Sequence, residues 1–449
     1  MTEPRDLMKR AALVGLAAAL GWGIRGSFGS FQGAMMPGAL AALGLLYVSG
    51  RKDWWPRAPY VLFCGIWFFA MGGEMSYGKV VGYCQAGTWI DATYGYAMLA
   101  VIGGFWGALG GGMIAWCLEP EFPRFRRWAI GIPLMLVGGR IAYYLVVTLA
   151  GVRMTPPRGD GWAYHLGMIL TLVVLAWRWN YRTVLRGIVY GFVGYGLGFA
   201  IGGWQHMFAT LQKGGYASWT TMEETVALLG GFALTYGVLS RAPSAAGTLE
   251  LWWRRAGWLV IFVAGAWVAW SMYERAFVGS RLWWAAFRGE RVDPELFVGN
   301  KVWLSWTSAA IALAVSLWLW FKAWYDSAQL GRAVAGWFIT HVALYTFWVS
   351  IKQGFLSDSA YFPPGFHFVF IIEMIVCIYI ASKWRPSPAL AVDGPAIDSR
   401  ERWMLPAIVV GIILLLGTAS QIVNDDGIPG SHRRFSQTET PNVILADSK

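Results

Sequence analysis

Charged side chains are scarce in this sequence: Asp, Glu, Lys and Arg together make up 14% of its 449 residues. Soluble globular domains carry about 25% charged residues, so this chain lacks the polar side chains that an aqueous surface needs. Hydrophobic residues make up 57% of the chain, and its mean hydropathy is +0.47. The composition excludes an ordinary soluble domain and predicts an all-α, polytopic membrane protein.

Cysteine and histidine are also few, with four and five residues. Only Cys84 lies in a loop, the other cysteines lie in apolar runs, and no CxxC occurs, which excludes a disulfide framework or a zinc knuckle. The sequence also lacks HExxH, a P-loop and a GxSxG elbow. Its glycine runs lie in apolar segments rather than after a strand, so they do not form dinucleotide-binding loops. We therefore expect no metal and no cofactor.

The net charge of +11 does not indicate nucleic acid, because the basic residues form no patch or stripe. They fall in small groups between apolar runs, as the positive-inside rule produces. With a cytoplasmic N-terminus, the inner segments hold 21 basic residues and the four short outer loops hold five. The expected partner is the lipid bilayer, and the expected location is a bacterial cytoplasmic (inner) membrane.

Apolar runs of about the length needed to cross a bilayer occur thirteen times. The first run follows Lys9 and Arg10 and resembles a signal peptide in length, but no polar cleavage region follows it, so an uncleaved first span is preferred. The predicted spans are 11–25, 33–50, 58–74, 94–117, 128–150, 162–177, 186–208, 223–240, 256–273, 302–324, 332–352, 365–382 and 404–422.

The spans make up a single transmembrane domain, 1–423, followed by an extracytoplasmic tail, 424–449. The odd number of spans places this tail outside. It is polar and contains Gly, Ser and Thr, which is typical of a flexible terminus.

An internal repeat is expected at the outer ends of alternate helices. Two segments share the order Gly, any, charge, any, Ser, aromatic, Gly, and a third is weaker. Each follows a rising helix and precedes a Gly-rich returning helix, a plan found in transporters. Glycines at four-residue spacing, such as Gly103, Gly107 and Gly111, also suit close helix packing. The segments are 23–29, 72–78 and 202–208, in helix pairs of about 11–50, 58–117 and 186–240.

Polar side chains near the outer ends predict a ligand site. Arg25 and Glu74 lie within spans and are flanked by glycines, and ionisable residues at such depth indicate function. Aromatic residues beside them suit a ring-bearing or hydroxylated ligand. The alternative is structural, since Trp and Tyr also anchor helices at both membrane interfaces. The candidate substrate-binding residues are Arg25, Glu74, Lys79, Asp91, Trp204 and His206.

Three ionisable residues, Arg140, His341 and Glu373, are expected near the midplane of the bilayer. Arg140 and Glu373 are the natural ion pair. One interpretation is a structural pair that joins three helices. The other is a proton or substrate relay in which His341 changes its charge.

A pair of acids, Glu223 and Glu224, follows Thr220 and Thr221. Such a pair resembles two catalytic carboxylates. Acidic residues after Ser or Thr are also ordinary at the start of a helix, and this capping interpretation is preferred.

These features favour a secondary transporter or permease for a small polar or anionic solute. The alternative is a transferase at the outer leaflet that acts on a lipid-linked or sugar substrate. It would use Glu74, Asp91 or Glu223 as base, and Arg25 or Lys79 to neutralise a phosphate. A third hypothesis is a non-catalytic scaffold subunit. An enzyme is less favoured because no catalytic signature occurs.

Overall fold

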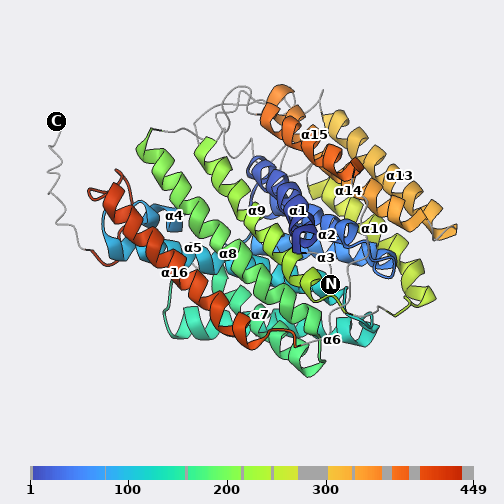
Figure 1. The fold of residues 1–449 in the computed structure, drawn as a ribbon, viewed down its shortest axis with the longest axis horizontal. Coiled ribbons are helices and arrows are strands. Elements are labelled where there is room, and N and C mark those ends of the chain that lie inside the picture. The colour runs from blue at the N-terminus through green and yellow to red at the C-terminus, as the bar shows by residue number, and fades with distance from the viewer. Residues whose placement is uncertain are drawn as a thin grey trace, which may run out of the picture.

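A computed structural model shows a bundle of helices (Figure 1). The described residues contain no strand, which confirms the all-α prediction. The structure describes residues 4–75, 77–156, 160–213, 217–243, 247–271, 302–325, 329–355, 367–383 and 395–436.

A helix overlaps each of the thirteen predicted ranges, and one short helix, α4, lies between two of them. The helices are α1 (Pro4–Arg25), α2 (Ser30–Ser49), α3 (Ala58–Gly72), α4 (Gly78–Cys84), α5 (Trp89–Trp116), α6 (Phe125–Tyr143), α7 (Gly161–Arg178), α8 (Arg182–Leu211), α9 (Ala217–Ser240), α10 (Leu251–Ser271), α13 (Val302–Tyr325), α14 (Leu330–Phe355), α15 (His367–Lys383) and α16 (Ser399–Val423). Shorter turns are η1 (Gly26–Phe28), η2 (Trp55–Arg57) and η3 (Tyr144–Leu149).

Seven helices of the described chain are long and apolar enough to cross a membrane, which is compatible with an integral membrane protein. They are fewer than the thirteen spans predicted. One reason is length, because α3 has 15 residues, whereas a crossing needs about 20. The seven candidates are Pro4–Phe28, Ser30–Ser49, Trp89–Trp116, Phe125–Leu149, Arg182–Leu211, Leu330–Ser350 and Ser399–Val423.

Contacts between six helices close into a ring at the centre of the bundle. In ring order, α1 packs on α2, α2 on α3, α3 on α5, α5 on α8, α8 on α9, and α9 back on α1. The three pairs α1–α2, α3–α5 and α8–α9 correspond to the three helix pairs of the predicted repeat. The contact between α1 and α9 is the seam at which the ring closes.

Glycine brings the backbones of neighbouring ring helices together. A Cβ atom on Gly107 of α5 would lie 2.2 Å from the carbonyl oxygen of Gly191 in α8. A Cβ on Gly38 of α2 would lie 2.1 Å from the carbonyl oxygen of Gly65 in α3. No larger residue fits at these contacts, so close packing of small residues holds the ring as it does in other membrane bundles.

Aromatic side chains fill the inside of the ring. Trp22 of α1 lies 4.7 Å from Trp106 and 5.5 Å from Tyr195, measured between ring centroids. Phe69 lies 5.3 Å from Tyr195, and Phe199 packs edge-on against Trp22. The contacts tie α1, α3, α5 and α8 together, so the ring encloses a packed core.

The remaining long helices lie outside the ring (Figure 1). Helices α14 and α15 cover α1 and α2, and α10 and α13 continue this layer beside α3. On the opposite side α7 and α16 pack on α5 and α8, and α6 packs on α7. Only 22% of the apolar window of α6 and 11% of that of α16 are buried, so their apolar faces point outward, as expected for contact with lipid.

Two of the three predicted repeat segments interrupt a helix. The first becomes η1 and a residue with positive φ, Gly29 at 84°, which turns the chain from α1 into α2. The second ends α3 and leads to Tyr77, the residue before α4. The third does not break the chain, because α8 continues through 202–208 to Leu211. The expected interruption there is absent because local glycines alone do not end a helix that is packed on both sides.

The segment after α16 returns to the bundle. Residues 424–436 lie against α4 and the start of α5, where Ile428 donates its backbone N–H to the carbonyl of Gln85 at 3.0 Å. The sequence predicts a flexible tail from Asn424 onward. Residues 437–449 of that tail lie outside the described residues.

Candidate functional site

A buried ion pair lies where the ring closes. Arg25 is the last residue of α1, and its Nη1 donates to Oε1 of Glu223 in α9 at 2.8 Å. The two side chains are 3% and 2% exposed. Burying two charges costs several kcal/mol each, and only close geometry and further hydrogen bonds offset that cost. The pair therefore depends on the side chains around it.

Two aromatic residues complete the coordination of this pair. The Tyr77 hydroxyl donates to Oε1 of Glu223 at 2.6 Å and accepts a hydrogen bond from Nη1 of Arg25 at 2.8 Å. The indole N–H of Trp219 donates to the same carboxylate oxygen at 3.2 Å, and its ring stacks on Tyr77 with centroids 5.7 Å apart. We call these four residues, Arg25, Tyr77, Trp219 and Glu223, the Arg25 cluster.

The guanidinium of Arg25 also lies over aromatic rings. Its Cζ is 4.9 Å from the ring centroid of Trp106 and 5.7 Å from that of Trp22, within the range of cation–π attraction. The Nε of Arg25 has no hydrogen-bond partner within the described chain, and neither has the indole nitrogen of Trp22. Buried donors of this kind are rare unless water or a ligand satisfies them. The cluster thus retains donor capacity that the protein does not use.

The capping interpretation of Glu223 and Glu224 is wrong. Helix α9 begins at Ala217, so the two acids are its seventh and eighth residues, beyond the first turn. Glu223 binds Arg25 instead of the helix start. Glu224 lies between α1 and α15, a helix outside the ring, because a Cβ on Gly23 of α1 would lie 2.8 Å from its Oε1 and 2.9 Å from Cε1 of Phe370 in α15.

A second carboxylate faces Glu224. Glu373 of α15 lies near enough for the two charges to interact, and α15 packs on α1 at this level through Phe370. Oε1 of Glu224 and Oε2 of Glu373 are buried, and neither oxygen has a hydrogen-bond partner in the part of the chain that the structure describes. Two adjacent carboxylates do not both ionise readily in an apolar surrounding. Two negative charges at this contact would therefore repel each other.

Among the other predicted outer residues, His206 lies next to the Arg25 cluster. Its Nδ1 is 3.0 Å from the hydroxyl of Ser218, and its ring meets Trp219 edge-on at 5.1 Å. Trp204 lies on the same helix, stacks on Phe208 at 5.4 Å, and has a buried indole nitrogen with no partner among the described residues. Of the six predicted residues, Arg25 and His206 therefore share one region.

The other three outer candidates lie elsewhere. Glu74 is exposed in the turn after α3, and Lys79 is partly exposed in α4. Asp91 is buried at the start of α5, and its Oδ1 accepts the backbone N–H groups of Arg434 and Phe435 at 2.8 and 2.9 Å. The carboxylate of Asp91 is therefore occupied by the chain itself.

The predicted midplane ion pair does not form. Arg140 is exposed in the last turn of α6, and its charge acts on the hydroxyl of Tyr164 in α7. Helices α6 and α15 lie on opposite sides of the ring (Figure 1), so Glu373 cannot reach Arg140. His341 is partly buried in α14, and its Nδ1 lies 2.8 Å from the carbonyl of Trp337. Sequence spacing gives depth along the membrane but not the side of the bundle, which explains the error.

At the other end of the ring, arginines bind backbone carbonyls. Nη1 of Arg10 donates to the carbonyl of Val48 in the last turn of α2 at 2.6 Å. Nη1 of Arg57 donates to the carbonyl of Cys117, just after α5, at 3.1 Å. Burial lowers the pKa of Arg57 to about 10. These arginines satisfy carbonyls that helices leave free at their C-termini.

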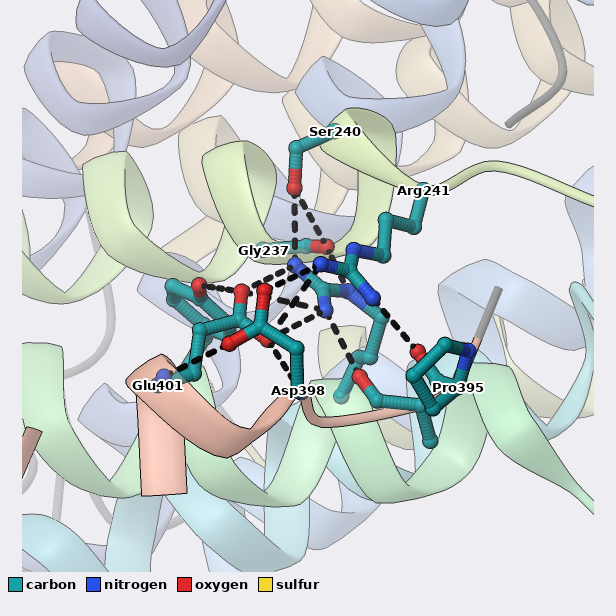
Figure 2. A network of polar contacts seen from close by, with 9 residues as sticks. Gly237, Ser240, Arg241, Pro395, Asp398 and Glu401 are labelled. Carbon is teal, nitrogen blue, oxygen red and sulfur yellow. Dashed lines mark hydrogen bonds and ion pairs between the residues drawn. The ribbon is translucent and has the colours of Figure 1, made fainter. Parts of the chain in front are cut away.

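Arg186 of α8 binds residues of another polar network, in which Figure 2 labels Ser240, Arg241 and Glu401. Its guanidinium donates to the carbonyl of Gly237 at 2.5 Å, to the carbonyl of Ala396 at 2.6 Å and to the hydroxyl of Ser240 at 2.8 Å. It also lies 3.3 Å from the carboxylate of Glu401. All three nitrogens of Arg186 thus have partners. We call the following residues the Arg186 cluster: Arg186, Tyr190, Ser240, Arg241, Asp398 and Glu401.

The same network starts helix α16. Asp398 accepts the N–H of Glu401 at 2.7 Å, and Glu401 accepts the N–H of Asp398 at 2.9 Å, which is a capping box. The hydrogen bond from the backbone N–H of Glu401 is the main cause that lowers the pKa of Asp398, and Arg241 adds to it. The Arg186 cluster therefore joins α8, α9 and α16.

Sequence reasoning identified Arg25 but missed its partner. Glu223 is 198 residues away and was interpreted as a cap. The available signal was charge: Arg25 is a cation at the outer end of a span, and Glu223 is an acid at the outer end of the third helix pair. Two opposite charges at the same expected depth in the membrane favour an ion pair.

Within the described residues, no three His, Cys, Asp or Glu side chains gather where they could hold a metal ion. The Arg25 cluster contains one acid and one cation, a combination suited to polar or anionic groups. No protein-family model, no curated protein and no solved structure matches this chain.

Proposed function

We propose that this chain is a secondary transporter or permease for a small polar or anionic solute, and that the solute binds at the Arg25 cluster. One observation carries the proposal: a buried arginine, held by side chains from other elements, has a donor with no partner among the residues that the structure describes. Ionisable groups at such positions in membrane bundles commonly mark substrate pathways.

The position of the cluster supports a transport cycle. Arg25 belongs to α1 and Glu223 to α9, so their ion pair closes the seam of the ring. A carboxylate or other acceptor group on a solute would compete with Glu223 for the guanidinium. Binding would then weaken the link between α1 and α9. Exchange of one partner for another couples solute binding to movement of two helix pairs, as alternating access requires.

The neighbouring acids extend this proposal. Glu224 and Glu373 lie on the outside of the same seam and interact with each other. A proton taken up by this pair would remove a negative charge beside Glu223. Proton movement and solute binding would thus act on one contact, which is the simplest form of coupling.

The transferase alternative has less support. Asp91, one of its three candidate bases, accepts hydrogen bonds from the backbone of residues 434–436. Glu223, another, is paired with Arg25. Glu74 alone stays exposed. An arginine and carboxylate that neutralise each other suit reversible binding better than proton abstraction.

Tracer uptake into proteoliposomes tests the proposal. The panel consists of acetate, lactate, inorganic phosphate and neutral glycerol, each measured with and without an inward proton gradient. We expect at least one anion to enter faster than in protein-free liposomes. Arg25→Gln should reduce that rate at least tenfold, because the guanidinium is the group that holds the solute.

The matched control is Arg126→Gln, which removes the same charge at an exposed position of α6. It should transport as the parent does. Equal uptake by Arg25→Gln and the parent, or no uptake of any solute above protein-free liposomes, would contradict the proposal.

A further inference from the structure

Residues 424–436 follow a defined path along the end of the ring that holds the Arg25 cluster. Asn424 donates its side-chain N–H to the carbonyl of Gln85 at 3.0 Å, and Ile428 donates its backbone N–H to the same carbonyl. Further along, the backbone N–H of His432 donates to the carbonyl of Gly82 at 3.0 Å. The segment is therefore attached to α4 at several points.

Asp91 is the main anchor of this segment. Its Oδ1 accepts the backbone N–H groups of Arg434 and Phe435, and its Oδ2 accepts that of Ser436 at 3.2 Å as well as the Ser436 hydroxyl. The Thr88 hydroxyl adds a bond to Oδ2 at 2.9 Å. Successive backbone N–H groups that surround one carboxylate form an anion-binding nest, and hydrogen bonds to an ionised acceptor are the strong ones.

The side chain of Arg434 reinforces the anchor. Its Nη1 donates to the hydroxyl of Tyr94 at 2.5 Å and to the carbonyl of Met154 at 2.7 Å. Its guanidinium lies 4.8 Å from the centroid of the Tyr94 ring. The segment thus binds the start of α5 and the loop before α7 together.

Residues 424–436 supply hydrogen-bond donors to the C-terminal end of α4. With seven residues, α4 has fewer than two turns, and isolated helices of this length are unstable. The last carbonyls of a helix need donors from elsewhere. For α4, the N–H of Ala86 binds the carbonyl of Tyr83. Residues 424–436 supply the donors that bind the carbonyls of Gly82 and of Gln85, the residue after the helix. The segment acts as the C-terminal cap of α4.

Helix α4 connects this cap to the Arg25 cluster. Tyr77 immediately precedes α4, and its carbonyl accepts the N–H of Val81 at 3.0 Å, a bond of the first turn. The hydroxyl of the same residue binds Arg25 and Glu223. The position of Tyr77 therefore depends on whether α4 is formed.

We propose that residues 424–436, anchored by Asp91, are a positioning segment that keeps α4 folded and so holds Tyr77 against Arg25 and Glu223. Asp91, predicted as a ligand contact, then acts on the site from a distance. Release of the segment would free Tyr77 and change the strength of the ion pair. Only the consequence for solute binding rests on the proposed function.

Hydrogen–deuterium exchange of the full-length protein tests the proposal, and it needs no solute. In Asp91→Asn the side-chain amide would place an N–H against the backbone N–H groups of 434–436, so the anchor should be lost. We expect exchange at least tenfold faster than in the parent, both in residues 428–436 and in α4. Fluorotyrosine incorporated at position 77 should give a shifted or broadened ¹⁹F signal in the same variant.

The matched control is Asp426→Asn, which removes the same charge from an exposed residue of the segment. It should exchange as the parent does. Should Asp91→Asn fold poorly, Arg434→Ala can be compared with Arg433→Ala, its exposed neighbour, using the same two readouts.

Two results would overturn the proposal. In the first, hydrogen–deuterium exchange becomes faster in residues 428–436, while the exchange of α4 and the ¹⁹F signal at position 77 stay as in the parent. The segment would then bind the surface without supporting α4. In the second, the anchor variants leave the segment itself protected. A change at Tyr77 without any transport in the parent would instead refute the proposed function and keep the positioning role.

Discussion

The two ends of the ring each carry an arginine, a glutamate and a tyrosine in contact, but the two groups differ in how the arginine is satisfied. Arg186 donates to two backbone carbonyls, a hydroxyl and Glu401, and all its nitrogens have partners. Arg25 is held by side chains and aromatic rings, and its Nε lacks a partner among the described residues. Complete satisfaction suits a structural joint, whereas the unpaired Nε of Arg25 among the described residues is the feature on which our proposal of a ligand site rests.

The two arginines differ most in what they contribute to the free energy of unfolding. Replacing Arg186 by Met removes the donor that binds the carbonyl of Ala396. It also leaves Glu401 with only the more distant Arg241 as its cation, at 3.9 Å, and Gly237 with only the hydroxyl of Ser240. We expect the free energy of unfolding to fall by about 3 to 5 kcal/mol, the cost of breaking a buried pair from one side. Unfolding in mixed micelles with increasing dodecyl sulfate measures this change.

The counterpart is the double variant Arg25→Met with Glu223→Gln, which removes both charges of the other pair. Gln still accepts the hydroxyl of Tyr77, and Met fills part of the aromatic surround. Its free energy of unfolding should stay within about 1 kcal/mol of the parent. A loss as large as that of Arg186→Met would show that both clusters are structural joints.

The Arg186 end should also carry a pH dependence that the Arg25 cluster does not explain. Glu119 is buried in the loop before α6, where its Oε1 accepts the N–H of Val184 at 2.8 Å, and burial raises its pKa to about 7. The folded protein therefore binds a proton more tightly than the unfolded chain, whose pKa is 4.5. Stability should fall as the pH rises from about 4.5 to about 7, by about 3 kcal/mol.

Unfolding of Glu119→Gln at pH 5 and pH 8 tests this dependence. The amide keeps the acceptor for the N–H of Val184 but does not ionise. The stability of the variant should therefore lack this fall between pH 5 and pH 8, and it should exceed that of the parent at pH 8. Glu121→Gln, which changes an exposed neighbour, should lose stability between pH 5 and pH 8 as the parent does. The same loss of stability in Glu119→Gln would show that another group causes the pH dependence.

A smaller effect than at Arg186 or Glu119 comes from the two tyrosine hydroxyls, each of which donates to a glutamate. Tyr77→Phe and Tyr190→Phe should each lower the free energy of unfolding by about 1 to 2 kcal/mol. They should differ in function: only Tyr77→Phe changes the solute concentration that gives half-maximal uptake. Equal uptake curves for both variants would remove the functional distinction between the clusters.

Helix type and position were predictable because apolar runs report burial or lipid contact directly. Each predicted range carries a helix, and Arg25 was singled out because glycines flank it within an apolar run. The number of candidate spans was not predictable from runs alone. One run ends in a helix too short to cross, α3 with 15 residues, which only the fold reveals.

Pairing across the bundle was the part that sequence could not supply. The depth of Arg140 and Glu373 was consistent with an ion pair, yet their helices lie on opposite sides of the ring. Glu223 and Arg25 are joined because α9 returns to α1, which depends on the packing of all six ring helices. The role of Asp91 was hidden for the same reason, since its partners follow α16.

The closed ring also sets the order of events during synthesis. Arg25 and Glu223 are 198 residues apart, and ribosomes add about 5 to 20 residues each second. The carboxylate that neutralises Arg25 is therefore made about 10 to 40 s after the arginine. During that interval α1 lies in or near the membrane with a guanidinium that has not yet met its counterion. The ion pair between Arg25 and Glu223 thus forms only after α9 has been synthesised.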